Sequence, residues 1–124
     1  MLANHFIEQL GIKTSFSGEI IDNLSGGNQQ KAIFSRLLAV KPDLMILNDP
    51  TRGIDVGSKE EIYKNIRELA GQGTSMIIVT SEIDELSYLA DRVIVLSKGE
   101  IRGEFVDEDV DLKNILTCAV GSKK

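Results

Sequence analysis

Short uninterrupted runs of aliphatic residues, separated by segments with helical periodicity, constrain this chain more than any other feature of its sequence. The runs are Leu44–Leu47, Met76–Val79 and Val93–Leu96. Such runs are typical of strands that are buried on both faces, as in a parallel sheet covered by helices. Strands that alternate with helices also predict right-handed crossover connections. We therefore expect an α/β fold with a mostly parallel sheet and flanking helices.

Helical segments fill the spaces between these runs. Residues 58–70 have helical spacing, and Ser58 with Glu61 predicts a capping box at the start of that helix. The dipeptide Lys98-Gly99 predicts a hairpin turn into a last, antiparallel strand. The remaining predicted elements are helices over Leu2–Leu10, Asn28–Val40 and Ile83–Ala90, a strand over Ile101–Val106, a short final helix after Asp111, and a frayed tail over residues 121–124.

Length, charge and cysteine content exclude several classes of protein. The 124 residues allow one domain or part of one. A net charge of −5 argues against a sequence-independent nucleic-acid binder, which needs a basic face. Cys118 is the only cysteine, which excludes an internal disulfide and a cysteine metal cluster. The longest aliphatic runs are far shorter than the roughly 20 residues that span a bilayer. If the protein serves transport, other chains must form the pore.

Two glycines stand at the entrance of a predicted helix in the segment Leu24–Lys31, which reads LSGGNQQK. Glycines let a phosphate approach the backbone, and a helix N-terminus offers unpaired N–H groups and a favourable dipole. A bare S-G-G would be interpreted as an ordinary loop with Ser25 near a helix start. The longer string resembles the signature motif of ATP-binding-cassette (ABC) proteins, whose usual form is L-S-G-G-Q. The form L-S-G-G-N-Q-Q-K is similar to the signature motif of the carbohydrate-importer branch of that family.

The resemblance implies a role for this segment at a nucleotide held by another domain. In the family the motif closes over the γ-phosphate of ATP bound to a partner domain, in a head-to-tail sandwich. The resemblance assigns that contact to Ser25, Gly26 and Gly27, while Asn28 begins the helix and assists.

Polar residues follow the first aliphatic run directly, at the end of a strand where open α/β sheets place their ligands. The segment Leu44–Lys59 resembles a Walker B strand followed by a D-loop. It follows the signature at the expected distance of one helix, one proline turn and one strand. The family pattern ends this strand in Asp-Glu, whereas this chain has Asn48-Asp49. A register in which Asp49 is the Walker B aspartate is the alternative, and Pro50-Thr51 argues against it.

Both departures predict impaired hydrolysis. The resemblance places Asn48 where an aspartate helps to hold Mg²⁺, and an amide has no negative charge to attract that ion. Asp49 stands where a glutamate polarises the attacking water, and its stem is shorter by one methylene. A misplacement of about 1 Å can cost roughly 10²-fold in rate. Asp55 matches the D-loop aspartate, which communicates between the two sites; the alternative is a turn or cap residue before the helix.

Ser81 takes the place of the family's switch histidine, which contacts the γ-phosphate. The second nucleotide-binding domain of ribose- and galactoside-type importers also tends to read Ser-Ser-Glu here. Ser81 with Asp84 three residues later is equally a helix N-cap arrangement, and we favour that interpretation. No G-x-x-x-x-G-K-[ST] loop occurs anywhere in the chain, so the Walker A loop that cradles ATP phosphates is missing.

The resemblance identifies the chain as the C-terminal portion of a cassette, the second one of a ribose- or galactoside-type importer subunit. Residues 1–40 would end the helical subdomain and residues 41–124 would form the second half of the catalytic core. Expected cofactors are ATP and Mg²⁺, in the complete assembly only. Expected partners are a second nucleotide-binding domain and membrane permease subunits, at the cytoplasmic face of the membrane, and no nucleic acid.

The isolated chain is predicted to be inactive, because it lacks the Walker A loop. It is also predicted to self-associate, because open strand edges tend to pair with another chain. The alternative function is a non-catalytic remnant that binds another cassette protein and contributes only its signature face. A third possibility is a DNA-repair or ribosome-associated cassette ATPase. The acidic balance of the chain and the sequence after Pro50-Thr51 argue against it.

Overall fold

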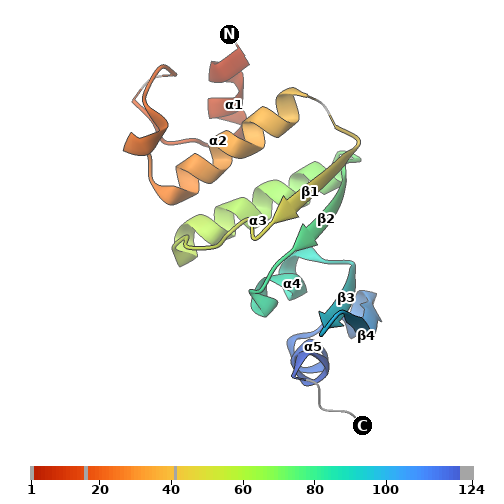
Figure 1. Ribbon diagram of the computed structural model, residues 1–124. Coiled ribbons are helices and arrows are strands. Elements are labelled where there is room, and N and C mark those ends of the chain that lie inside the picture. The colour runs from red at the N-terminus through yellow and green to blue at the C-terminus, as the bar shows by residue number, and fades with distance from the viewer. Residues whose placement is uncertain (1, 16, 41, 121–124) are drawn as a thin grey trace. The chain divides into compact units, whose positions relative to one another are not determined.

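The computed structural model describes residues 2–15, 17–40 and 42–120, and the predicted tail at 121–124 lies outside this part of the chain. The fold divides into two compact units, one ending at Val79 and the other beginning at Thr80. The elements of the first unit are α1 (Leu2–Leu10), the 3-10 turn η1 (Ile21–Asn23), α2 (Gly26–Ala39), β1 (Leu44–Asn48), α3 (Val56–Gly71) and β2 (Ser75–Val79) (Figure 1).

A strand–helix–strand unit dominates the first unit. β1 and β2 pair in parallel, from Leu44 opposite Ser75 to Asn48 opposite Val79, with α3 connecting them. The backbone N–H of Asp49 continues the pairing with a hydrogen bond of 2.7 Å to the carbonyl of Val79. The predicted parallel pair and its crossover helix are therefore confirmed, as is the α/β fold class.

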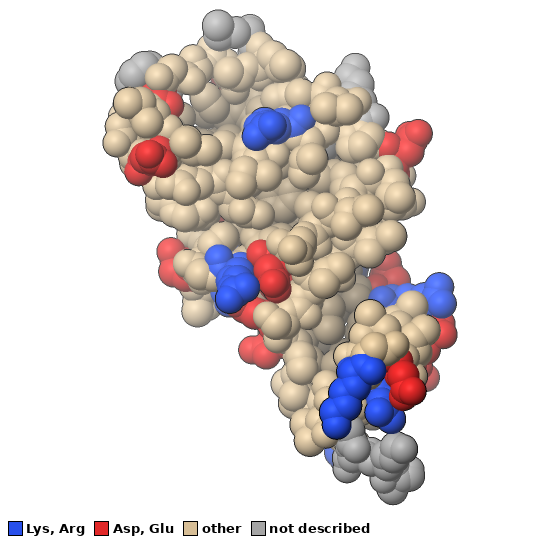
Figure 2. All heavy atoms as spheres, viewed as in Figure 1, with Lys and Arg blue, Asp and Glu red and all other residues tan. Residues whose placement is uncertain are grey.

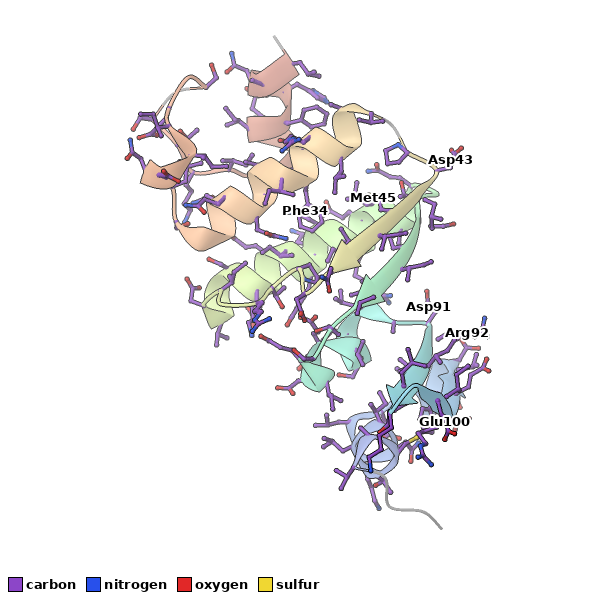
Figure 3. The ribbon with its side chains drawn as sticks, viewed as in Figure 1. Phe34, Asp43, Met45, Asp91, Arg92 and Glu100 are labelled. Atoms are coloured by element: carbon purple, nitrogen blue, oxygen red, sulfur yellow. The ribbon has the colours of Figure 1, made fainter. Side chains whose placement is uncertain are left out.

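The core of this unit lies on one face of the two strands. Figure 3 shows Phe34 of α2 and Met45 of β1 among the side chains of that core. α3 contributes buried residues at helical spacing, because positions i, i+4 and i+7 share one face. The buried apolar residues of the unit are Phe6, Leu10, Phe34, Met45, Leu47, Ile62, Ile66 and Leu69.

The expectation that the aliphatic runs are buried on both faces is wrong for this chain. Along β1, Met45 is 2% exposed whereas its neighbour Ile46 is 67% exposed. Successive side chains of a strand point to opposite faces, so the described residues cover only one of them. Leu44, Ile46, Ile77 and Val79 lie on the other face, where all four are exposed.

Asp55, and not Ser58, caps α3. The helix begins at Val56, and one carboxylate oxygen of Asp55 accepts a hydrogen bond of 2.8 Å from the backbone N–H of Ser58. The predicted capping box of Ser58 and Glu61 is therefore wrong. An aspartate placed before the first turn caps the helix more N-terminally, and Ser58 is already inside the helix.

The second unit is a β-hairpin packed with two helices. Its elements are α4 (Ile83–Leu89), β3 (Arg92–Ser97), β4 (Glu100–Val106), the 3-10 turn η2 (Asp107–Asp109) and α5 (Leu112–Ala119). β3 and β4 are antiparallel, and Arg92 of β3, labelled in Figure 3, donates a 2.7 Å hydrogen bond to Glu104 of β4. Val93, Val95 and Ile115 form the buried cluster.

The predicted hairpin turn is confirmed. Lys98 and Gly99 both have positive φ, 51° and 78°. Positive φ at both central residues defines the turn whose twist matches that of the flanking strands. Among the described residues, no helix is long and apolar enough to cross a membrane.

Candidate functional site

Ser25 stands immediately before α2 and caps it. Its carbonyl accepts from the backbone N–H of Gln29 at 2.8 Å, and its Oγ accepts from the backbone N–H of Asn28 at 3.2 Å. α2 begins at Gly26, two residues earlier than predicted. Ser25 and Gly26 are exposed at this helix N-terminus. The geometry therefore presents a hydroxyl and backbone N–H groups to the outside, as anion binding at a helix start requires.

The two glycines of the segment differ in what surrounds them. A Cβ placed on Gly26 would meet only Ile54 Cγ1, at 3.9 Å, which is an ordinary contact. A Cβ on Gly27 would lie 2.5 Å from the Cβ of Ser58, near the start of α3. Gly27 is buried, so its missing side chain lets α2 and α3 approach each other. Gly26 remains accessible.

Both polar atoms of the Asn28 side chain form hydrogen bonds within the chain. Its Oδ1 accepts from the backbone N–H of Lys13 at 2.9 Å, and its Nδ2 donates to Ser25 Oγ at 2.8 Å. The residue is buried. Its oxygen and its nitrogen thus each have a partner within the chain, and one of these partners is Ser25.

Lys31, at the end of the same segment, is a buried cation that the sequence interpretation did not single out. Its ammonium group donates to the carbonyl of Gly11 at 3.3 Å and lies 2.5 Å from the carboxylate of Glu61 on α3. The hydrogen bond from Lys31 is the main reason that the pKa of Glu61 lies below its ordinary value. A lysine followed by a glutamate on the next helix gave no sequence signal, because the contact spans 30 positions.

Asn48 and Asp49 lie at the C-terminal end of β1, where the sequence predicted them. Asn48 is exposed as the last residue of the strand. Asp49 has a φ of 45°, in the left-handed region that aspartate tolerates better than most residues. Its carbonyl accepts from the backbone N–H of Arg52 at 3.2 Å, and its carboxylate lies 3.9 Å from the Arg52 guanidinium. The chain therefore turns sharply directly after the strand.

Asp55 lies at the end of the loop that follows. Besides the backbone N–H of Ser58, its carboxylate accepts from the Ser58 hydroxyl at 3.3 Å. These bonds to Ser58 lower the pKa of Asp55 below its ordinary value, because they stabilise the ionised form. The capping interpretation of Asp55 is thus what the structure describes, and its role in communication between sites stays a prediction.

The structure brings the first two motifs together through Ser58. Ser58 packs against Gly27 of the LSGGNQQK segment and holds the carboxylate of Asp55. Ile54, from the same loop, lies beside Gly26. The signature segment and the loop after β1 therefore form one continuous surface of the first unit.

Ser81 belongs to the second unit and is exposed there. The prediction that it caps the following helix is wrong. α4 begins at Ile83 with Glu82 as its N-cap residue, and it is Thr80 Oγ1 that accepts from the backbone N–H of Glu82, at 2.9 Å. The helix starts one residue later than a cap at Ser81 needs.

The residues at the end of β1 do not by themselves suit a magnesium ion. Mg²⁺ prefers an octahedral set of oxygen ligands with carboxylate charge. Asn48 offers a neutral amide, and Asp49 lies near Arg52. Within the described ranges, no group of three or more His, Cys, Asp or Glu residues is placed to hold a metal.

Charged side chains are scattered over the face drawn in Figure 2. Blue and red spheres occur singly or in small mixed groups there, and no continuous basic surface is visible. A continuous basic surface is what phosphate-backbone binding requires.

Curated proteins similar to this chain are sugar import ATP-binding proteins. The xylose import ATP-binding protein XylG of Photobacterium profundum is 46% identical over 117 residues, which is 94% of this chain and 23% of that protein. The galactose/methyl galactoside import ATP-binding protein MglA 1 of the same organism is 43% identical over 111 residues, or 90% and 22%. The chain thus spans about a quarter of the length of these relatives. No family model matches it.

Solved structures with a similar fold are ATP-binding cassettes. An ATP-binding cassette of an ABC transporter superposes with a TM-score of 0.81 and 25% identity, over 95% of this chain and 47% of that chain. A dimeric cassette in a post-hydrolysis state bound to ADP and Pi gives a TM-score of 0.72 and 26% identity, over 85% and 45%. The resemblance and the fold predicted from the sequence are both confirmed.

Proposed function

Because this chain is a homologue of sugar import ATP-binding proteins and has the fold of an ABC ATPase cassette, we propose that it supplies the C-terminal part of one cassette in a carbohydrate importer. Its residues 1–40 would end the helical subdomain, and residues 41–124 would complete the catalytic core. The observation that carries the proposal is the 46% identity to a xylose import ATP-binding protein over 94% of the chain.

In this proposal the exposed turn at Ser25 and Gly26 contacts the γ-phosphate of ATP that a partner cassette holds. The exposed hydroxyl and helix N-terminus support it, since both donate hydrogen bonds to anions. Gly27 acts differently from Gly26, because it lets α2 approach α3. Asp55 then lies in the same surface through Ser58 and is placed to respond to the partner cassette. Ser81 would face the nucleotide of its own cassette.

The proposed partners are a second nucleotide-binding domain and membrane permease subunits, at the cytoplasmic face of the membrane. Among the solved structures of similar fold is a dimeric ATP-binding cassette, which supports the first of these. ATP and Mg²⁺ would be bound only in the complete assembly. The chain contains no Walker A loop, so most contacts to the nucleotide must come from elsewhere.

The test uses a complete cassette, which we define as this whole chain placed after the N-terminal remainder of the corresponding cassette of the xylose import ATP-binding protein of Photobacterium profundum. Adding ATP should convert this complete cassette from monomer to dimer in analytical ultracentrifugation. Ser25→Ala should weaken the dimer by about tenfold or more, because a hydrogen bond to a charged group is worth roughly 1.5–3 kcal/mol. Ser87→Ala, an exposed serine in the second unit, is the matched control. An ATP-dependent dimer that is indifferent to Ser25→Ala would contradict the proposal.

A second function is favoured by one specific observation. Asn48-Asp49 replaces the Asp-Glu of hydrolytic cassettes, so the chain could serve as a non-catalytic partner that offers only its signature face. In that case the complete cassette would dimerise with ATP but release no phosphate above background. The relative's own unaltered cassette is the positive control for both measurements.

A further inference from the structure

We infer that Asn28 orients the hydroxyl of Ser25, so that the hydroxyl hydrogen points away from the chain toward an incoming phosphate oxygen. The inference rests on the proposed function, which places Ser25 at a nucleotide held by a partner cassette. It assigns Asn28 as a positioning residue, because its side chain is buried and donates to Ser25.

The surroundings of Asn28 fix which end of its amide faces Ser25. The backbone N–H of Lys13 lies 2.9 Å from one amide atom. An N–H group can only donate, so that atom must be the carbonyl oxygen. The NH₂ group therefore faces Ser25 and donates to its Oγ at 2.8 Å. With Asn28 only 9% exposed, bulk water has little access to compete for these bonds.

Two donors then occupy the acceptor sites of the Ser25 hydroxyl. A hydroxyl oxygen has two lone pairs and one hydrogen. The Asn28 side chain donates at 2.8 Å and the Asn28 backbone N–H at 3.2 Å. Within the part of the chain that the structure describes, no acceptor is recorded for the remaining hydrogen, and Ser25 is exposed. The hydroxyl is thus left to donate outward.

This arrangement favours an anion over a cation or a neutral donor. A freely rotating hydroxyl spends part of its time with a lone pair toward a phosphate, and aligning it costs entropy on binding. Fixing it in the donating orientation before binding removes that cost. The dipole of α2, which begins at Gly26, also favours negative charge at this end of the helix. By holding the hydroxyl of the capping residue Ser25 in its donating orientation, Asn28 therefore makes the site favour an anion.

The experiment is a double-mutant cycle in the complete cassette, with the affinity of the ATP-dependent dimer as the readout. Asn28→Asp keeps the size of the side chain and an oxygen for Lys13. An ionised carboxylate cannot donate to Ser25 and would instead accept its hydrogen, reversing the hydroxyl. We expect Ser25→Ala and Asn28→Asp each to weaken the dimer by about tenfold or more. Asn28→Gln keeps the amide donor, so this variant should retain most of the dimer affinity that Asn28→Asp loses.

The cycle separates hydroxyl orientation from charge and from folding. The added negative charge of Asn28→Asp weakens the dimer in both backgrounds and cancels in the comparison. We expect Asn28→Asp to cost at least about fivefold less in the Ser25→Ala background than in the background with Ser25. Thermal unfolding of each variant reports any loss of structure, which would act equally in both backgrounds.

Equal costs of Asn28→Asp in the two backgrounds would overturn the role of Asn28 and leave the proposed function standing. An ATP-dependent dimer unaffected by Ser25→Ala would overturn the proposed function instead, and the orientation of Ser25 would then have no ligand to serve. The two failures are therefore distinguishable within one set of four proteins.

Discussion

Adjacent glycines in one motif have different structural reasons to be glycine. Gly26 is open and exposed, whereas a Cβ on Gly27 would clash with the side chain of Ser58. We expect Gly27→Ala to destabilise the complete cassette by about 1–3 kcal/mol, because a methyl group must displace Ser58 and the start of α3. Gly26→Ala should be neutral or slightly stabilising, since alanine is the better helix former. Urea unfolding followed by circular dichroism compares the two, and equal stabilities would show that the close approach is absent.

Asn48 and Asp49, at the end of β1, are the residues from which we predict slow ATP hydrolysis. Restoring the family pattern by Asn48→Asp with Asp49→Glu adds one negative charge and extends the second carboxylate by one methylene. We expect turnover of the complete cassette to rise at least about tenfold, or about 1.4 kcal/mol of barrier, with little change in ATP affinity. Each single reversion should recover less than the double, because the two groups act as a unit. Steady-state phosphate release measures all four proteins. The same turnover in each of them would mean that the natural pair is competent.

Between elements, the ion pair of the buried Lys31 and the exposed Glu61 joins α2 to α3. The pKa of Glu61 is lower in the folded chain than its ordinary value of 4.5, mainly through the hydrogen bond from Lys31. The folded state therefore favours the ionised carboxylate. This stabilisation is fully present above the ordinary pKa and is lost as the pH falls through the lower, folded value. At pH values below about 4.5, we expect the urea concentration at the unfolding midpoint of the complete cassette to decrease. The decrease should be smaller in Glu61→Gln. If the urea midpoint depended on pH in the same way in the unaltered cassette and in Glu61→Gln, the stabilising ion pair of Glu61 with Lys31 would be contradicted.

Removing either partner of this pair should have unequal effects at neutral pH. Lys31 is 3% exposed and Glu61 is 52% exposed. Glu61→Gln leaves a buried ammonium without its counter-charge and should cost about 1 kcal/mol, a small value because solvent screens the exposed carboxylate. Lys31→Met replaces the buried charge by an apolar chain of similar length and should be close to neutral. If Lys31→Met proved the more destabilising in urea unfolding, a dominant role for the ammonium hydrogen bonds would follow.

For the whole molecule, the uncovered face of β1 and β2 predicts self-association of the isolated chain. Ile46 and Ile77 are directly paired and both exposed, with further aliphatic residues beside them. Burying one such side chain is worth roughly 1.5–3 kcal/mol. We expect light scattering to show a dimer or larger species, and Ile46→Thr with Ile77→Thr to weaken it by more than about tenfold. Val56→Thr, an exposed aliphatic residue at the start of α3, is the control. A clean monomer of the unaltered chain would contradict the prediction.

The isolated chain should not bind ATP with micromolar affinity. The exposed turn at Ser25 and Gly26 offers one hydroxyl and a few N–H groups, which cannot offset the entropy of immobilising the nucleotide. Isothermal titration calorimetry of the chain with Mg-ATP measures this directly, and the complete cassette is the positive control. Clear one-to-one micromolar binding to the chain alone would show that this chain contains a nucleotide site of its own.

The sequence by itself determined the order and type of the elements and the place of the motifs. Aliphatic runs, helical spacing and the Lys98-Gly99 turn are local signals, because each depends on residues close in the chain. They predicted the parallel pair, the hairpin, and the position of Asn48 and Asp49 at a strand end. The LSGGNQQK string likewise predicted the similarity to ABC proteins, since its letters carry the resemblance without any structure.

Only the tertiary structure decided which residues of those motifs act on each other. The packing of Gly27 against Ser58 and the pairing of Lys31 with Glu61 join residues about 30 positions apart. No local periodicity records such contacts, because they depend on how two helices meet. The N-cap residues of α3 and α4 also differ from the predicted ones. Hydrogen-bond geometry, and not residue type alone, selects among neighbouring candidates. Burial of one sheet face likewise depends on what is packed there, which an aliphatic run cannot specify.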